Sequence, residues 1–388
     1  MNGISAWRYI KNNKRRVSVL VVSLTLCFVL LYVMKFLLTT SNCTYSFLYT
    51  GLYSKMQHMS LSGGSITEDY SDQVSDMDLD EREVYYEKIN QELVQKLKED
   101  DRISDAFFAP VLYIQVNGLI GSDGATVPLV SREKVTEIAD LYDAELSEGK
   151  MPENPGEVAV SRYLLNNQDM KIGGSYLNYA DYKITGVLEC DGYLAIGIPA
   201  EEYGGFSKRI YTVSDVEDIR TVMSDAGITI RDSYDGYYDL TKGKEDLKKE
   251  VTDVMETSSS LVSRVVFVML FIALSAVYTV HLRDRRSEWC LYSSIGFSSE
   301  EIYFSIMREL LITFGIAVFF GILVTGAAVT ASDMIFLKPH GILSEYWKPD
   351  VFVMIISAYI LFIGILQIPV VYALHRIRTI DSADDEMI

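Results

Sequence analysis

Four long apolar runs divide this chain, and a large polar block separates the first run from the other three. The runs cover residues 17–38, 261–282, 310–331 and 351–374, and the block covers residues 39–260. A helix needs about 20 apolar residues to cross a bilayer, and each run is that long. The pattern therefore predicts a membrane protein with four transmembrane α-helices, one before the block and three after it.

The first run has a second interpretation, as a cleaved secretory signal peptide. Its apolar stretch exceeds the roughly 7–15 residues of a signal core, and no A-x-A-like cleavage site follows it. We therefore expect a retained helix.

Helix-like and strand-like patterns alternate within the polar block. Helical spacing covers residues 82–100, 135–148 and 215–226, whereas strand-like runs cover 107–116, 127–130, 157–160, 182–189, 194–199, 210–213 and 228–231. Such a mixture predicts an α+β domain. The pattern at 82–118 is similar to that at 210–250, which indicates two lobes: a base built from both ends of the block and an inserted lobe near 121–207.

Two segments of the block have a distinct composition. Residues 242–260 form a charged helical pattern that leads directly into the second apolar run, which predicts a continuous stalk helix. Residues 56–80 are poor in aliphatic residues and rich in Ser, Gly and Asp, and we expect a linker or an exposed loop there.

Basic residues predict the orientation in the membrane. They precede the first run, flank the loop between the second and third runs, and follow the fourth: Arg8, Lys11, Lys14, Arg15, Arg16, Arg283, Arg285, Arg286, Arg308, Arg376 and Arg378. By the positive-inside rule, segments 1–16, 283–309 and 375–388 are cytoplasmic, so both termini are inside. The block and the loop 332–350 are then external. Segment 1–16 is predicted to be amphipathic and to lie on the inner face, with a disordered basic tail as the alternative.

The net charge of −18 is concentrated in the polar block, where residues 39–260 carry 41 acidic and 20 basic side chains, a net charge of −21. Solubility explains most of this acidity, and attraction of cationic peptides is a weaker alternative. We expect no nucleic-acid partner, because the external domain would repel phosphates.

Candidate ligand sets are weak. Cys43 and Cys190 are the two external cysteines that a disulfide can join, although their spacing does not demand one. The acidic pattern that begins at Asp76 and ends at Glu87 is similar to a calcium-binding loop, but Glu81 stands where the sharp turn needs glycine. A solvated acidic loop is the preferred interpretation, and we expect no metal site.

Enzyme motifs are absent from the sequence. Gly149-Lys150 is followed by Met151, so no phosphate-binding GxxxxGK[ST] motif forms, and neither HExxH nor GxSxG occurs. The apolar runs hold no ionisable residue near mid-membrane, which disfavours ion-driven transport. We therefore expect neither enzymatic activity nor a bound cofactor in this chain.

The short charged segment 283–309, called the elbow here, carries the most specific local signals. The second helix is expected to continue to Ser294, and Gly296 is suited to end it. Ser298 and Glu301 have the spacing of a capping box that begins a new helix. The pattern predicts a helix-turn-helix with a charged edge that faces the cytoplasm; an ordinary solvated loop is the alternative.

The elbow resembles the signature of the MacB/FtsX-type (type VII) ABC transporter permeases. The shared residues are Arg285-x-x-Glu288, Ile295-Gly296 and Glu309, while Trp289-Cys290, Ser293 and Phe297 depart from the family pattern. The order of one helix, a large external domain and three further helices is also similar to that family. So are the external motifs GKMPENPGEVAVS at 149–161, KIGG at 171–174 and YKITGV at 182–187.

The resemblance implies a bacterial plasma-membrane permease that forms a homodimer or heterodimer on two separate ATPase subunits, which would bind ATP and Mg²⁺. It implies mechanotransmission, in which ATP-driven closure on the cytoplasmic side moves the external domains. The elbow residues that would couple to the ATPase are Arg283, Arg285, Arg286, Glu288, Ile295, Gly296, Ser298, Glu301 and Glu309.

Three functions remain open at this stage. The first is export or clearance of peptides, antimicrobials or lipids, with or without an external membrane-fusion or substrate-binding protein. The second is an FtsX-like regulator of an external cell-wall hydrolase. The third is a membrane receptor without an ATPase, which the elbow signature disfavours.

Overall fold

A computed structural model describes residues 6–48, 56–59, 77–119, 121–177, 179–200, 208–214, 222, 225, 240–344 and 349–385. The chain splits into two compact units. Unit 1 consists of Met1–Leu38, Thr257–Ser332 and Glu345–Ile388, and unit 2 consists of Thr39–Glu256 and Asp333–Ser344. The helix predicted at 215–226, the strand at 228–231 and most of segment 56–80 lie outside the described residues.

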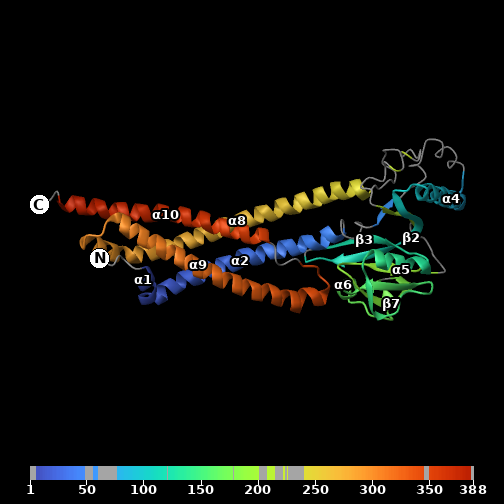
Figure 1. The fold of residues 1–388 in the computed structure, drawn as a ribbon, viewed down its shortest axis with the longest axis horizontal. Coiled ribbons are helices and arrows are strands. Elements are labelled where there is room, and N and C mark those ends of the chain that lie inside the picture. Colours follow the sequence, from blue (N-terminus) through green and yellow to red (C-terminus); the bar gives the residue numbers. More distant parts are fainter. Residues whose placement is uncertain are drawn as a thin grey trace. The chain divides into compact units, whose positions relative to one another are not determined.

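Unit 1 is built from helices (Figure 1). They are α1 (Ala6–Asn12), α2 (Lys14–Ser46), α8 (Leu240–Ser294), α9 (Ser299–Ser332) and α10 (Pro349–Asp385), of which α2 and α8 continue into unit 2. Four stretches are long and apolar enough to cross a membrane: Lys14–Thr44, Ser260–Ser294, Ser299–His340 and Val351–Tyr372. These stretches contain the four predicted apolar runs almost completely.

Aromatic side chains join the long helices of unit 1. The Phe314 ring of α9 meets the Tyr359 and Phe362 rings of α10, with centroids 5.3 and 5.8 Å apart. The Tyr359 hydroxyl donates to the Leu24 carbonyl of α2 at 2.6 Å. Gly321 of α9 lies against the Phe28 ring, which would be 2.7 Å from a Cβ at that position. The absence of a side chain at Gly321 therefore lets α2 approach α9 closely.

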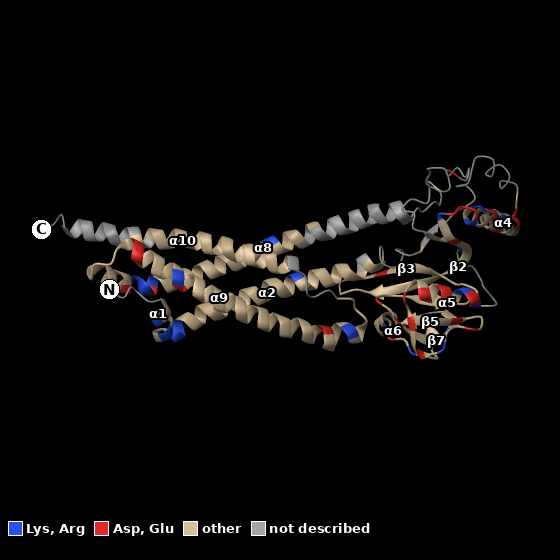
Figure 2. Ribbon diagram, in the orientation of Figure 1, with Lys and Arg blue, Asp and Glu red and all other residues tan. Residues whose placement is uncertain are grey.

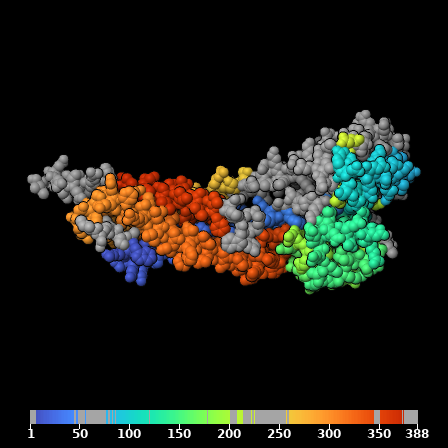
Figure 3. Space-filling view, viewed as in Figure 1, coloured from blue at the N-terminus to red at the C-terminus, as the bar shows by residue number. Residues whose placement is uncertain are grey.

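The outer surface of these helices is apolar. Charged residues are sparse along their central turns and frequent over unit 2 (Figure 2). The surface of α9 and α10, orange and red in Figure 3, includes exposed apolar side chains. They include Leu311, Phe319, Phe320, Leu323, Val353, Ile360, Leu361 and Ile368. Because an apolar surface of this extent is costly in water, it fits helices that face lipid.

The first sheet of unit 2 joins strands from both ends of the polar block. Its order is β1-β9-β2-β3, formed by β1 (Gln57–Met59), β9 (Lys208–Ser214), β2 (Ile103–Asn117) and β3 (Ser122–Pro128). Strands β2 and β9 are antiparallel, with Phe107 opposite Tyr211. Helix α4 (Leu79–Lys98) packs against β2. Strands β1, β2 and β9 come from the two ends of the block, where the base is predicted, whereas β3 comes from within the segment predicted as an insertion.

The second sheet lies within the segment predicted as an insertion. Its order is β4-β7-β5-β8, and β6 pairs with β7. The strands are β4 (Glu145–Gly149), β5 (Glu157–Ser161), β6 (Ser175–Tyr176), β7 (Tyr179–Glu189) and β8 (Ala195–Gly197). Helices α5 (Arg132–Leu141) and α6 (Arg162–Asn167) accompany it. Buried residues of both sheets, such as Leu112 and Ile184, form a common core, so unit 2 is α+β as predicted.

Two local expectations are corrected. The predicted helix 135–148 ends at Leu141, because Asp143 takes a left-handed backbone with φ of 51° and Glu145–Gly149 pairs with β7 as a strand. In the acidic segment, Asp78 is the N-cap of α4 and forms a reciprocal capping box with Glu81. Asp78 and Glu81 therefore begin a helix instead of belonging to a solvated loop, and Asp76 lies outside the described residues.

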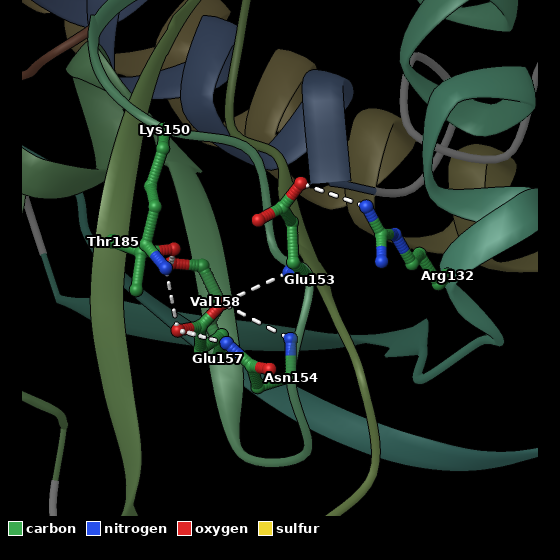
Figure 4. Close-up of polar contacts among 7 residues, drawn as sticks. All are labelled: Arg132, Lys150, Glu153, Asn154, Glu157, Val158 and Thr185. Atoms are coloured by element: carbon green, nitrogen blue, oxygen red, sulfur yellow. Dashed lines mark hydrogen bonds and ion pairs between the residues drawn. The ribbon is translucent and has the colours of Figure 1, made fainter.

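The turn rich in Pro and Gly before β5 is fixed by one carboxylate (Figure 4). Glu157 accepts hydrogen bonds from the backbone N–H groups of Glu153 and Asn154 at 2.8 and 3.1 Å. The Lys150 ammonium donates to the same carboxylate at 2.9 Å. Burial acts to raise the pKa of Glu157, but these hydrogen bonds outweigh it and lower the pKa to about 2.

The segment after α9 differs most from expectation. A short external loop is predicted at 332–350, but the chain stays helical through a π-helical turn, η3 (Asp333–Leu337), and a 3₁₀ turn, η4 (Lys338–His340). Residues 333–344 belong to unit 2 rather than to the helical unit.

Candidate functional site

The elbow begins where α8 ends. Gly296 has a φ of 99°, its N–H donates to the Ser293 carbonyl, and the Phe297 N–H donates to the Tyr292 carbonyl at 3.1 Å. This pair of hydrogen bonds is a Schellman motif, and the rings of Tyr292 and Phe297 make the apolar contact that accompanies it. A Cβ at Gly296 would meet no atom within 4 Å, so the backbone angle, not space, requires glycine.

Helix α9 begins two residues later with a capping box. The Ser298 N–H donates to the Glu301 carboxylate at 2.9 Å, and the Glu301 N–H donates to the Ser298 hydroxyl at 3.2 Å. Each side chain satisfies a backbone group that has no partner within the helix. The predicted helix-turn-helix is therefore present, with a turn that is ordered at both ends.

A buried ion pair connects the two arms of the elbow. Arg285 of α8 donates to the Glu309 carboxylate of α9 at 2.5 Å, and their side chains are only 4% and 6% exposed. The other Glu309 oxygen lies 3.4 Å from His281 Nε2, and Arg285 also reaches Glu288 at 3.4 Å. Because α8 and α9 share this pair, one arm cannot slide along the other without separating two buried charges.

Aromatic rings enclose the ion pair. The Tyr9 ring of α1 lies 3.6 Å from the Arg285 guanidinium carbon, and the Trp289 ring lies 5.8 Å from it, both within cation–π range. Tyr278 stacks on His281 with centroids 6.2 Å apart. Burial raises the pKa of Tyr9 to about 12, so its hydroxyl stays neutral.

Some polar groups of the aromatic residues around the ion pair lack hydrogen-bond partners. Within the described residues, the hydroxyls of Tyr9 and Tyr278 and the indole N–H of Trp289 are buried without a hydrogen-bond partner. Each such group costs about 1–3 kcal/mol. An apolar cluster of the same size would hold the arms together at least as well, so the polar cluster is better explained by a fixed register between α8 and α9 than by stability.

The structure separates the predicted coupling residues into an inner and an outer set. Arg285 and Glu309 are buried inside the elbow instead of lying on its charged edge. Arg286 and Glu288 are half-buried. The exposed residues are Arg283, Ile295, Gly296, Ser298 and Glu301.

The exposed face of the elbow also carries apolar side chains that the sequence analysis did not select. Leu291, Ile295 and Phe304 are 59%, 60% and 58% exposed. Arg283 and Glu301 of the same segment are exposed as well, and a mixture of exposed apolar and charged groups is typical of a protein–protein contact. Together with Arg283 and Glu301, these three side chains are called the elbow face below.

Sequence reasoning also missed the aromatic enclosure, although part of its signal is present. Tyr278, His281, Arg285 and Trp289 follow one another at helical spacing and therefore lie on one side of α8. No pattern in the sequence indicates the position of Tyr9, because its contact with Arg285 depends on how α1 packs against the other helices. In the predicted amphipathic segment Trp7 is exposed, whereas Tyr9 is the buried residue.

The disulfide that the sequence left open stays a prediction. The structure records no sulfur–sulfur bond between Cys43 and Cys190, and Cys190 Sγ lies 3.8 Å from the Gly192 carbonyl oxygen. Cys290, in the elbow, is the cysteine that is exposed. Within the described part of the chain, no group of three or more His, Cys, Asp or Glu is placed to hold a metal ion.

The fold and the elbow define a class: a membrane protein with four candidate spanning helices and a mixed α/β unit, whose second and third spans join in an ordered helix-turn-helix. No protein-family profile matches the chain, and no curated protein matches it. Among solved structures it is similar to the extracellular domain of the noncanonic ABC-type transporter YknZ from Gram-positive bacteria. The identity is 10% and the TM-score 0.26, over 46% of this chain and 100% of that one.

Proposed function

We propose that this chain is the permease subunit of an ABC transporter that works by mechanotransmission. A separate ATPase subunit binds ATP and Mg²⁺ and contacts the elbow from the cytoplasm. When the ATPase subunits close on ATP, the elbow moves, and the helices on either side of it carry that motion to the external unit. The proposal also holds that the chain itself is not an enzyme.

The observation that carries this proposal is the buried pair of Arg285 and Glu309 between two long helices. A loop that only connects two spans needs no internal ion pair, no Schellman motif and no capping box. These features make the turn stiff, so a force on its face is passed to both helices instead of bending the loop.

The elbow face supports an ATPase partner. Its apolar side chains Leu291, Ile295 and Phe304 would supply buried area, and Arg283 and Glu301 would supply charge complementarity at the rim. The resemblance of the Arg285-x-x-Glu288 and Ile295-Gly296 motifs to the MacB/FtsX-type permeases points to the same partner.

Helix α8 supports the transmission of motion. It is continuous from Leu240 to Ser294, so the predicted stalk at 242–260 and the second span are one helix. We place the elbow and both termini in the cytoplasm of a bacterium and unit 2 outside, following the distribution of basic residues. Since four spans enclose little space, the functional unit would be a homodimer or heterodimer of permeases in the plasma membrane.

For the cargo, we propose export or clearance of peptides, antimicrobials or lipids from the outer face, alone or with an external membrane-fusion or substrate-binding protein. The alternative is regulation of an external cell-wall hydrolase, for which the same motion would serve. A neighbouring gene for a hydrolase would favour regulation, and one for a fusion protein would favour transport.

The deciding experiment purifies the chain with its genomic neighbours and measures ATPase activity with and without candidate peptides. We expect an ATPase to co-purify and its activity to respond to a ligand of unit 2. A chain that purifies without any ATPase from a membrane where the neighbours are expressed would refute the proposal and favour a receptor.

Variants of the elbow sharpen this experiment. Glu288→Lys and Gly296→Pro are expected to abolish the ligand response while the chain still inserts, and Ile295→Asp is expected to weaken ATPase co-purification at least tenfold. Glu133→Lys and Ile172→Asp make the same changes at exposed positions of unit 2 and serve as matched controls. Full ligand response in either of the first two variants would contradict the role of the elbow.

A further inference from the structure

Both arms of the elbow lead into unit 2. Helix α8 enters the elbow from a segment of unit 2 that ends at Glu256. Helix α9 leaves the elbow and continues through η3 and η4 without a break, so the chain is helical from Ser299 to His340. The last part of this helical stretch, from Asp333 onward, is again part of unit 2.

The helical stretch ends at a glycine that lies against α6. Gly341 has a left-handed backbone with a φ of 59°. A Cβ on Gly341 would stand 2.0 Å from the Tyr163 carbonyl oxygen and 2.6 Å from the Asn167 nitrogen. Both obstacles are backbone atoms, which cannot move aside as a flexible side chain can. Only glycine therefore allows this close contact.

Hydrogen bonds fix the contact on both sides of Gly341. The Tyr193 hydroxyl donates to the Gly341 carbonyl at 2.9 Å and accepts from the Leu343 N–H at 3.2 Å. The Asn167 side chain donates to the same Gly341 carbonyl at 3.2 Å. Tyr193 is fully buried, with its ring against those of Phe47 and Tyr163. The packing of the ring therefore fixes the position of the Tyr193 hydroxyl that binds Gly341 and Leu343.

The segment is also closed on itself. Asp333, at its start, is 2% exposed, and it accepts from the Ser344 hydroxyl at 2.5 Å. The Lys338 ammonium lies 3.2 Å from the other Asp333 oxygen. These contacts join the two ends of residues 333–344 and make them one compact body, which is called the tether below.

We propose that the tether is a further mechanical link beside α2 and the stalk, through which α9 moves the inserted part of unit 2 at α6 and Tyr193. Tyr193, Asn167 and Gly341 are its positioning residues. This inference rests on the proposed function and extends it. Helix α2 and the stalk attach unit 2 to only one arm of the elbow, because α2 is not part of the elbow. The tether attaches unit 2 to the other arm as well, so unit 2 must follow any tilt of one arm relative to the other.

The test compares two glycine variants of the full chain in lipid nanodiscs by hydrogen exchange. Gly341→Ala places a methyl group against the α6 backbone and should expel the tether, so exchange over 333–344 and 163–167 should rise at least tenfold. Gly173→Ala is the matched control, because Gly173 also has a positive φ, of 83°, but its Cβ would meet nothing within 4 Å. Unchanged exchange over the tether in Gly341→Ala would overturn the proposal.

The second part measures transmission in the complex with the co-purified ATPase. ATP should change the exchange of α6 and of residues 193–197 in the wild type and in Gly173→Ala. The change should be at least halved in Gly341→Ala and in the milder Tyr193→Phe, which keeps the buried ring, while basal ATPase activity stays unchanged. A full ATP-dependent change in a variant whose tether is released would also overturn the proposal.

Failure of the tether and failure of the proposed function give different results. If the wild type shows no ATP-dependent change anywhere in unit 2, the proposed function fails and the mechanical role of the tether fails with it. If the wild type and Gly173→Ala respond and the two tether variants respond equally, only the tether is wrong.

Discussion

Arg285 and Glu309 show how a buried charge pair acts at the scale of single residues. Removing two charges from water costs several kcal/mol for each, and their attraction returns this only when the geometry is good. Here the geometry is good, at 2.5 Å, with the Tyr9 ring on the guanidinium. The pair contributes little net stability, but either charge alone would be costly. This asymmetry can be measured.

Glu309→Ala is expected to destabilise unit 1 by about 3–5 kcal/mol, because it leaves the Arg285 charge buried and unpaired. The double variant Arg285→Met with Glu309→Leu should recover most of that loss, since it replaces both charges with apolar groups of similar volume. Denaturant unfolding in detergent, followed by tryptophan fluorescence, measures both. Glu300→Ala, at an exposed position of the same helix, is the control and should change stability by less than about 0.5 kcal/mol. A double variant as unstable as the single one would contradict this account.

Glu157 gives unit 2 a stability that depends on acidity. Its pKa is lowered from 4.5 in the unfolded chain to about 2 in the folded chain, so the folded protein favours the ionised form. The contribution is complete above about pH 4.5 and is lost as the pH falls to about 2. Glu157→Gln should therefore lower the unfolding temperature of unit 2 at pH 6, and the difference from wild type should vanish near pH 2.

Calorimetry between pH 6 and pH 2 measures this difference. Glu145→Gln, an exposed glutamate of β4, is the matched control and should show a nearly constant offset. A difference for Glu157→Gln that stays the same down to pH 2 would mean that its hydrogen bonds do not depend on charge.

At the scale of elements, the elbow is specified almost entirely by local sequence. Gly296 sets a backbone angle, and Ser298 and Glu301 satisfy backbone groups within three residues of each other. Such signals act over a few positions, so the helix-turn-helix could be predicted without knowledge of the rest of the chain. The same holds for the strands β2, β5, β7 and β9, whose side-chain patterns alternate or are continuously apolar.

Elements that depend on distant partners could not be predicted in this way. Residues 145–148 have a helical pattern but belong to β4, because β7 offers them hydrogen bonds. Residues 333–344 look like a short loop, and their role depends on Tyr193 and α6, more than 140 positions earlier in the chain. The place of Tyr9 against Arg285 is fixed in the same non-local manner.

Ser298→Ala is expected to destabilise the first turn of α9 by about 1 kcal/mol, because the Glu301 N–H loses its acceptor. Hydrogen exchange of residues 299–302 should rise about fivefold, with little change at Glu309. Ser299→Ala alters the neighbouring serine without touching the capping box and is the control. Equal exchange in both variants would show that the cap does not order the turn.

At the scale of the whole molecule, charge is divided between the units. Acidic residues dominate the polar block, whereas the segments that flank the spans are basic. The proposed orientation follows from this division of charge, so it could be predicted from the positions of basic residues in the sequence alone. The proposed contact with an ATPase cannot be deduced in this way, because it would depend on side chains from both arms of the elbow.

The orientation predicts which lysines are reached from outside. In intact cells, a membrane-impermeant amine reagent should modify Lys171 and Lys183, which are exposed on unit 2. It should not modify Lys11, which is exposed in α1, or Lys14, which is exposed at the start of α2. All four should react once the membrane is opened with detergent. Mass spectrometry of the peptides measures this directly. Modification of Lys14 in intact cells would show that the proposed orientation is wrong.

The exposed thiol of Cys290 gives the elbow a natural reporter group. It lies beside Leu291 on the same turn of α8, while Cys27 is buried and burial raises the pKa of Cys190 to about 12, which keeps that thiol unreactive. An environment-sensitive maleimide dye would therefore react faster at Cys290 than at Cys27 or Cys190, and Cys290 is also more exposed than the half-buried Cys43. Its emission would follow the arrival and departure of a cytoplasmic partner in real time, on a chain that carries its natural sequence.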